Sequence, residues 1–221
     1  MNLYIKRILS LSLVLLFGCE ASHADEQCRS GHFSSYNTDF KLFEIAEDKA
    51  FFLKDYKGCP NTENCKRKYY SSKGDRMVVS KQYLNWSCAW NVDSKKLLAG
   101  WVETKKMSPI VLKSVLSQAE IEGVWKNGRT GKIKIVSSNE GALKAVGEAI
   151  WYGNSINHEG GFEGELVDTG SQYQVKSDEA EYQCLVNMFF ISQNYMVAQD
   201  NGNCGGVNVR FNGVYKKLEL K

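Results

Sequence analysis

The sequence predicts an all-β fold of two small domains joined by one helix. From residue 40 onward the chain consists mainly of short strand-like runs separated by Gly, Asn, Asp and Ser, which is typical of small β-domains. Helical periodicity is confined to a single stretch. Seven cysteines among 221 residues also suit small domains that are cross-linked by disulfides.

The first 24 residues have the order of a secretory signal peptide. Lys6 and Arg7 precede the apolar run 8–17, and small residues follow up to Ala24, as in a positive start, an apolar core and a cleavage site. The apolar run is too short to cross a bilayer, which takes about 20 residues. We therefore expect export from a bacterial cytoplasm and a periplasmic or secreted mature protein.

Two processing patterns compete at the end of this segment. Small residues before Asp25 suit a signal peptidase that releases a free chain, residues 1–24 being lost. The sequence Leu-Phe-Gly-Cys at 16–19 instead resembles a lipoprotein box, in which Cys19 is acylated and anchors the protein in a membrane. Free release is favoured because Phe17 is bulkier than the usual residue of such a box.

The first β-domain is expected at residues 40–107, after a short N-terminal segment at 25–39. Its runs are short and are bounded by turn residues, which favours a small barrel over an α/β sheet. The predicted strands are 41–45, 50–55, 67–70, 75–81, 85–91 and 99–103.

Residues 108–122 are predicted to form the connecting helix. Ser108 suits the cap position and Pro109 the first helical position. The apolar residues recur at three- and four-residue spacing, which predicts one buried stripe. They are Val111, Leu112, Val115, Leu116 and Ala119.

The second β-domain is expected at residues 123–218. Eight successive strands with short turns fit an up-and-down barrel or a strongly curled sheet. In the last run, Val207, Val209 and Phe211 alternate with polar residues, as on the two faces of a strand. The predicted strands are 123–126, 132–136, 142–152, 161–168, 172–176, 182–191, 195–199 and 207–216.

Six cysteines remain for disulfides, because Cys19 is removed or acylated. Six cysteines allow 15 pairings, which the sequence alone does not resolve. Chain position favours three of them: Cys184 and Cys204 stand alone in the C-terminal half, Cys59 and Cys65 can close a small loop, and Cys28 is left for Cys88.

Several short motifs mark the first domain, namely Lys49-Ala50-Phe51-Phe52, Lys68-Tyr69-Tyr70, Lys73-Gly74-Asp75-Arg76-Met77-Val78-Val79, Trp86 and Gly100-Trp101-Val102. With these motifs the domain resembles the bacterial SH3-like domain of secreted proteins. The resemblance covers about a third of the chain, and an insertion between Cys59 and Cys65 departs from the plainest form of that domain. It implies a small barrel with a ligand groove and, by analogy, a ligand in the cell wall.

The second domain resembles a group of exported proteobacterial proteins, and this resemblance implies no activity. It rests on Gly123-Val124-Trp125, on the segment 146–151 (VGEAIW) and on the segment 200–215, which reads DNGNCGGVNVRFNGVY.

No residue pattern points to catalysis or to a cofactor. His32 and His158 fall in different halves, and the cysteine spacings do not suit zinc. Glu148, Glu163 and Glu165 could converge in a barrel mouth with Asp200 for glycosidase chemistry. However, strand alternation places such residues on the solvent face by default. We therefore expect no catalytic residue, no metal and no cofactor.

The segment 200–206 also has too few acids for a calcium loop. Its Asn and Gly residues suit a tight turn that Cys204 pins to the neighbouring strand. The mature chain carries little net charge, since loss of Lys6, Arg7 and Glu20 changes +3 to +2. The short basic run 66–68 is typical of a solvated strand edge, so we expect no nucleic-acid partner.

Aromatic residues are the remaining candidates for a binding surface. We expect Trp86 and Trp101 in the core, which leaves Tyr69, Tyr70 and Trp90 as surface contacts to a ligand. The expected function is recognition of a peptide, a protein or peptidoglycan in the bacterial envelope. The alternative is an inhibitor or immunity protein that blocks a wall-degrading enzyme with a rigid loop such as 200–206.

Overall fold

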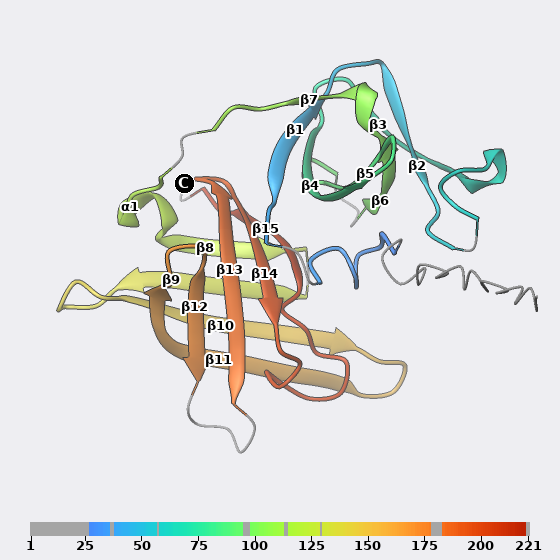
Figure 1. Cartoon of the computed structure of the whole chain (residues 1–221). Coiled ribbons are helices and arrows are strands. Elements are labelled where there is room, and N and C mark those ends of the chain that lie inside the picture. The colour runs from blue at the N-terminus through green and yellow to red at the C-terminus, as the bar shows by residue number, and fades with distance from the viewer. Residues whose placement is uncertain are drawn as a thin grey trace, which may run out of the picture.

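The computed structural model describes residues 27–35, 38–56, 58–94, 98–112, 115–128, 130–177 and 183–219. The predicted signal peptide 1–24 and Cys19 lie outside these residues. As predicted, the described chain is all-β: a seven-stranded antiparallel sheet is followed by a closed eight-stranded barrel (Figure 1). No described helix is both long and apolar enough to span a membrane.

The first sheet contains the six strands that the sequence predicts between residues 40 and 107, with ends that differ by one or two residues. Its strand order is β3-β2-β6-β5-β4-β1-β7, so β3 and β7 are its edges, and it curls round on itself (Figure 1). The strands are β1 (Lys41–Ile45), β2 (Lys49–Leu53), β3 (Lys66–Ser72), β4 (Arg76–Tyr83), β5 (Trp86–Asn91), β6 (Leu98–Glu103) and β7 (Met107–Pro109).

Both faces of this sheet are buried over much of its area. Ala89 and Val102 belong to the cluster on the inner, concave face. Cys88, Trp90 and Trp101 belong to a second cluster on the outer face. Since successive side chains of a strand point to opposite faces, β5 and β6 contribute to both clusters and show no simple alternation of burial.

The connecting helix is much shorter than the sequence predicts. Residues 107–109 form β7, which pairs with β1 at the sheet edge, a position where Pro109 removes no needed hydrogen bond. Val111 and Val115 of the predicted apolar stripe are exposed, whereas Leu112 and Leu116 are half-buried and pack against the hydrophobic clusters. The helix is confined to α1 (Gln118–Ile121), which begins at a capping box between Ser117 and Glu120.

The second domain is a closed up-and-down barrel, which is the first of the two forms that the sequence predicts. Each strand pairs with the next, and β15 closes the barrel against β8. The strands are β8 (Gly123–Asn127), β9 (Gly131–Ser137), β10 (Leu143–Tyr152), β11 (Asn157–Asp168), β12 (Tyr173–Ser177), β13 (Cys184–Ser192), β14 (Tyr195–Asp200) and β15 (Gly213–Lys217).

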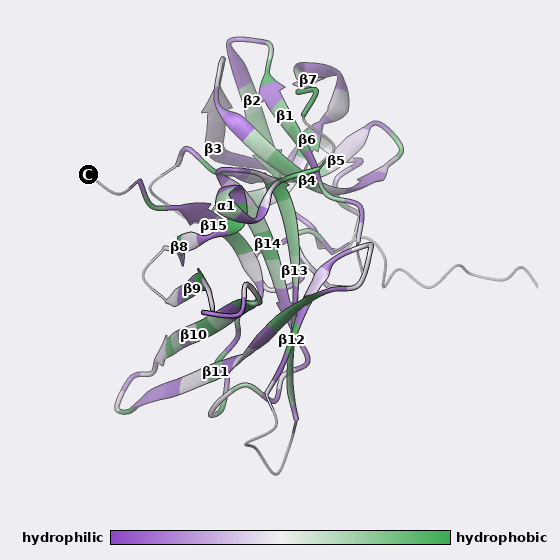
Figure 2. Ribbon diagram, turned by 90° about the vertical axis from the view of Figure 1, so that its left-hand side faces the viewer, coloured by the Kyte–Doolittle hydropathy of each residue, from purple (hydrophilic) through white to green (hydrophobic). Residues whose placement is uncertain are grey.

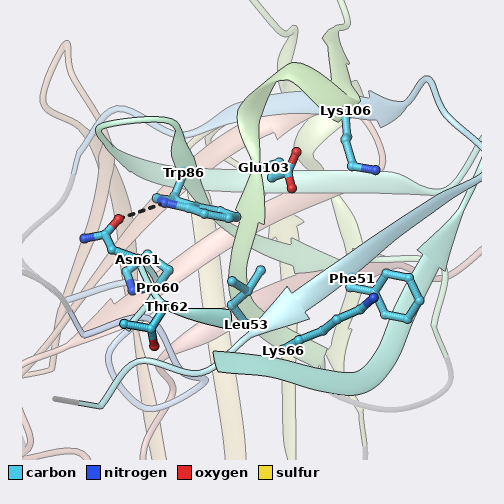
Figure 3. Close-up of a pocket in the computed structure, with 9 residues that line it drawn as sticks. All are labelled: Phe51, Leu53, Pro60, Asn61, Thr62, Lys66, Trp86, Glu103 and Lys106. Carbon is cyan, nitrogen blue, oxygen red and sulfur yellow. Dashed lines mark hydrogen bonds between the residues drawn. The ribbon is translucent and has the colours of Figure 1, made fainter. Parts of the chain in front are cut away.

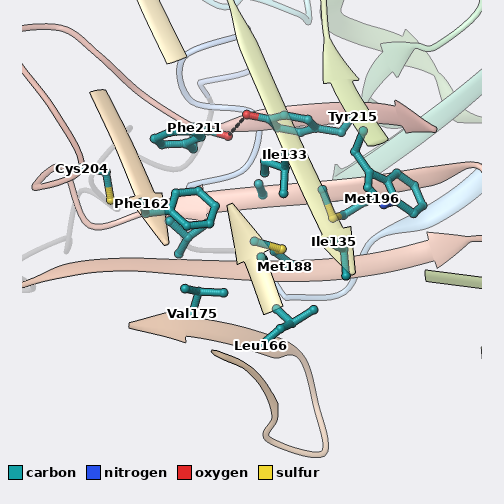
Figure 4. Packing of buried hydrophobic residues seen from close by; sticks show 14 of the residues in the cluster. Ile133, Ile135, Phe162, Leu166, Val175, Met188, Met196, Cys204, Phe211 and Tyr215 are labelled. Carbon is teal, nitrogen blue, oxygen red and sulfur yellow. Dashed lines mark hydrogen bonds between the residues drawn. The ribbon is translucent and has the colours of Figure 1, made fainter. Parts of the chain in front are cut away.

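The barrel interior is filled with apolar side chains from every strand (Figure 4). Hydrophobic and hydrophilic positions alternate along these strands (Figure 2), as expected for a barrel with a side-chain core. Phe162 and Phe211 meet edge to face with ring centroids 4.8 Å apart. Tyr215 is fully buried, and its hydroxyl donates to the carbonyl oxygen of Phe211 at 3.0 Å. Burial raises the pKa of Tyr215 well above its ordinary value, which keeps this donor protonated.

The last strand begins later than predicted, at Gly213 rather than at residue 207. Val207 is 67 % exposed and Asn208 has a φ of +66°, so the chain is not extended there. Asp200 organises this loop, because Oδ1 accepts from the Gly202 amide at 2.7 Å and Oδ2 accepts from the Phe211 amide. These local hydrogen bonds compete with the strand ladder.

All three favoured disulfides are confirmed: Cys28–Cys88, Cys59–Cys65 and Cys184–Cys204. The first ties the N-terminal segment to β5, and the third ties the loop after β14 to β13. Three disulfides are compatible with a periplasmic or extracellular location.

The two domains share one hydrophobic cluster. Phe40 and Phe189 pack edge to face at 5.2 Å, and Phe33 packs in the same way on Trp90 at 5.3 Å. Tyr195 and Val197 of β14 and Val214 of β15 complete the contact from the barrel side. The outer face of the first sheet is therefore covered by the barrel at the Trp90 end of β5.

An ion pair lies beside this contact. Arg76 binds Asp93 through two hydrogen bonds, Nε to Oδ2 at 3.0 Å and Nη2 to Oδ1 at 2.6 Å. Lys216 of the barrel lies 3.9 Å from the same carboxylate. Burial by itself would raise the pKa of Asp93, but hydrogen bonds from Arg76 outweigh burial and lower this pKa.

Asp93→Asn should therefore change how stability depends on pH. A lowered folded-state pKa stabilises the fold above the unfolded pKa of about 3.9, and this stabilisation disappears as pH falls through the folded value. At pH 7 we expect a loss of about 1 kcal/mol, the upper end for a partly exposed pair, and this loss should shrink as pH falls below the unfolded pKa. Urea unfolding at several pH values measures this. Asp39→Asn, at an exposed pair with Lys41, is the control, and an equal loss at pH 3 and pH 7 would refute the prediction.

Candidate functional site

A pocket of about 560 Å³ opens on the outer face of the first sheet. It lies at the end of β5 where Trp86 is, whereas Trp90 lies on the same face of β5 at the other end of the strand. Its volume is within the range of small-molecule sites. The lining residues are Phe51, Leu53, Pro60, Asn61, Thr62, Lys66, Trp86, Glu103 and Lys106 (Figure 3).

One wall of the pocket is the loop closed by the Cys59–Cys65 disulfide. Pro60 is buried, while Asn61 and Thr62 are exposed on the pocket side. The indole Nε1 of Trp86 donates to Oδ1 of Asn61 at 3.1 Å, and Thr62 Oγ1 lies 3.0 Å from Cys65 Sγ. The short cross-linked loop and this hydrogen bond fix the Trp86 ring at the pocket rim.

The opposite wall combines an aromatic ring with an amine. Phe51 on β2 is half-buried, and Nζ of Lys66 on β3 lies 3.7 Å from its ring centroid. Figure 3 shows this pair facing Trp86 and Asn61 across the pocket, with Leu53 between them. The two aromatic walls can accept flat or ring-shaped apolar groups, since aromatic faces suit such contacts.

Two charged side chains complete the lining. Glu103 forms an ion pair with Lys105 at 3.2 Å. Lys106 forms an ion pair with Glu47, also at 3.2 Å, and donates to the carbonyl oxygen of Lys49 at 3.4 Å. Lys106 is therefore held by its neighbours, whereas Oε2 of Glu103 is buried and, despite the short distance to Lys105, has no hydrogen-bond partner among the described residues.

The three aromatic residues predicted from the sequence as ligand contacts do not lie on one surface. Tyr69 and Tyr70 are exposed, at 39 % and 43 %, but neither lines the pocket. Tyr70 pairs with Phe51 on the pocket face of the sheet, and strand alternation turns Tyr69 to the other face. Trp90 is only 3 % exposed and packs against the barrel, so its prediction as a surface contact is wrong. Trp86, predicted as core, instead lines the pocket, whereas Trp101 is fully buried as predicted.

The candidate carboxylates of the barrel do not converge. Glu148, Glu163 and Glu165 are exposed on the outer surface of β10 and β11, and Glu148 pairs with Lys132 at 2.9 Å. Asp200 is engaged by backbone amides of its own loop. The alternation of strand faces accounts for this arrangement.

The two histidines that the structure describes, His32 and His158, lie on different elements. His32 belongs to the N-terminal segment, and His158 stacks near Trp151 on the barrel at 5.4 Å. Among the residues that the structure describes, no group of three or more His, Cys, Asp or Glu side chains is placed to hold a metal ion.

Comparison with protein-family models and with curated protein sequences found no match. No protein-family model matches this chain, and no curated protein sequence matches it. The pocket and its surroundings therefore carry the functional argument.

Proposed function

We propose that this protein is an exported, non-enzymatic binding protein of the bacterial envelope that recognises its ligand through the pocket at Trp86. Peptide, protein and peptidoglycan are the three candidate ligands. The pocket fits peptidoglycan best, because two aromatic walls suit sugar rings and the charged lining suits amide and carboxylate groups. The resemblance of the first domain to bacterial SH3-like domains supports the same choice.

The pocket at Trp86 is the observation that carries this proposal. It is wide enough for a sugar or a short peptide, and the disulfide-closed loop makes one wall rigid before binding. A rigid site loses less conformational freedom when the ligand binds.

Trp86→Ala should weaken binding to purified peptidoglycan about tenfold or more, as expected for a central aromatic contact. The measurement is co-sedimentation with insoluble peptidoglycan over a range of protein concentrations. Trp151→Ala is the matched control, because Trp151 is 37 % exposed but lies on the barrel. Near-UV circular dichroism verifies that both variants fold.

Two results would overturn the proposal. One is a wild-type protein that does not sediment with peptidoglycan. The other is a Trp86→Ala variant that sediments as well as the wild type.

A second function is favoured by the loop after β14. This loop is held by Cys184–Cys204, by Asp200 and by a bridge between Gly160 and Gly205. It exposes Val207 at 67 %, so a rigid apolar tip projects into solvent. We propose as the alternative that this tip blocks a wall-degrading enzyme. An activity assay of lysozyme or an amidase with stoichiometric protein tests it, and unchanged activity with both enzymes would count against it.

A further inference from the structure

Beside the pocket, two adjacent aromatic rings on the outer face of β2 and β3 are flanked by two lysines. Lys66 lies over Phe51 at 3.7 Å, Phe51 and Tyr70 have ring centroids 5.5 Å apart, and Lys49 lies over Tyr70 at 4.9 Å. We call these four residues the lysine–aromatic ladder. Phe51 and Lys66 also line the pocket, so the ladder continues the site along the sheet.

The ladder has basic neighbours. Lys68 lies over Tyr69 at 5.5 Å, and Lys54 lies over Tyr56 at 5.1 Å. Across the described residues, no carboxylate lies within 4.0 Å of the amines of Lys49, Lys54, Lys66 or Lys68. Residues 40–107 contain 14 Lys and Arg against 8 Asp and Glu, whereas residues 123–218 contain 9 against 10. The positive charge of this nearly neutral protein is therefore concentrated in the domain that carries the pocket.

We propose that the lysine–aromatic ladder is a subsite for the carboxylate groups of a glycan-based ligand, namely the free carboxylates of peptidoglycan. This inference rests on the proposed function and specifies which chemical groups the site reads. The amines of Lys66 and Lys49, which lie over the rings of Phe51 and Tyr70, pair with the carboxylates, and the parts of the two rings that the amines leave uncovered contact the sugar. The ladder itself carries no acidic residue that would repel such groups.

A protective role for the lysines does not account for the arrangement. Lysines on an edge strand discourage pairing with other chains, and β3 is such an edge. Lys49, however, lies on β2, which has a partner on both sides. That role also gives no reason to place the rings of Phe51 and Tyr70 next to each other beneath the two amines. Aromatic faces beside amines are instead suited to ligands that carry both rings and negative charge.

The test compares native peptidoglycan with peptidoglycan whose free carboxylates have been amidated with carbodiimide. We expect the wild-type protein to bind the amidated material about five- to tenfold more weakly, and binding to native material to weaken with added salt. Lys49→Gln combined with Lys66→Gln should weaken binding to native peptidoglycan by a similar factor, and this double variant should no longer distinguish native from amidated material. Lys134→Gln combined with Lys144→Gln, exposed on the barrel, is the control with the same change of charge.

The outcomes separate the two proposals. Equal binding of native and amidated peptidoglycan would overturn the carboxylate subsite and keep the proposed function. Binding of polygalacturonate but not of peptidoglycan, lost in the Lys49/Lys66 double variant, would keep the subsite and overturn the proposed function. Binding of polyglutamate with neither glycan bound would overturn both the subsite for a glycan-based ligand and the choice of peptidoglycan among the three candidate ligands, since the ligand would then be an acidic polypeptide.

Discussion

Trp90→Ala is expected to lower the free energy of unfolding by about 3–5 kcal/mol, the range for removal of a large buried aromatic side chain. Trp90 is 3 % exposed and contacts Phe33 edge to face in the cluster that both domains share. Its loss leaves a cavity that rigid strands on both sides cannot close. The cost should therefore lie at the upper part of this range.

The same substitution should also change the form of the transition. With the shared cluster intact, we expect the sheet and the barrel to unfold together. Without Trp90, the barrel core around Phe162 and Phe211 remains complete and should unfold at its own temperature. Differential scanning calorimetry of the wild type and the variant distinguishes one peak from two. Trp86→Ala is the internal control, because its ring is half-exposed, and a similar loss in both variants would contradict this account of the interface.

Asp200→Asn should be nearly as harmful as Asp200→Ala, although asparagine has the same shape as aspartate. Both carboxylate oxygens accept from backbone amides, one from Gly202 and one from Phe211. An asparagine keeps one acceptor oxygen and turns the other position into a donor. That donor would face an amide hydrogen, so we expect a loss of about 2–4 kcal/mol. Urea unfolding of the two variants measures it.

Asp168→Asn provides the comparison for this prediction. Asp168 Oδ1 accepts from the Gly170 amide at 2.7 Å in the turn after β11, and the residue is exposed. An asparagine can retain this bond, so the expected loss is within about 0.5 kcal/mol. If Asp200→Asn cost no more than Asp168→Asn, the described role of Asp200 would be incorrect.

The strands of both domains follow from local sequence, because turn residues mark their ends and alternation marks the barrel faces. The helix does not. Ser108 and Pro109 suit a helix start, but the same residues pair with β1 as an edge strand, and this pairing depends on a partner more than 60 residues earlier. Local sequence also places the start of β15 too early, because side-chain hydrogen bonds of Asp200 replace the hydrogen bonds between strands up to Phe211.

The site shows the same limit of local reasoning. Trp86 and Trp90 lie four residues apart on one face of β5, so alternation cannot tell them apart. The barrel covers Trp90 and leaves Trp86 open, and this difference arises from docking between domains. The Cys59–Cys65 pairing could be inferred from chain position, but that the loop forms a pocket wall depends on where β2, β5 and β6 bring Phe51, Trp86 and Glu103 together.

The unequal burial of the five tryptophans makes the protein its own optical probe. Trp90, Trp101 and Trp125 are sealed from water, so a collisional quencher such as iodide reaches the indoles of Trp86 and Trp151 only. In a Trp151→Phe background, Trp86 would be the sole quenchable fluorophore. A ligand that occupies the pocket would then reduce the iodide quenching of Trp86 fluorescence, so binding could be followed without any added label.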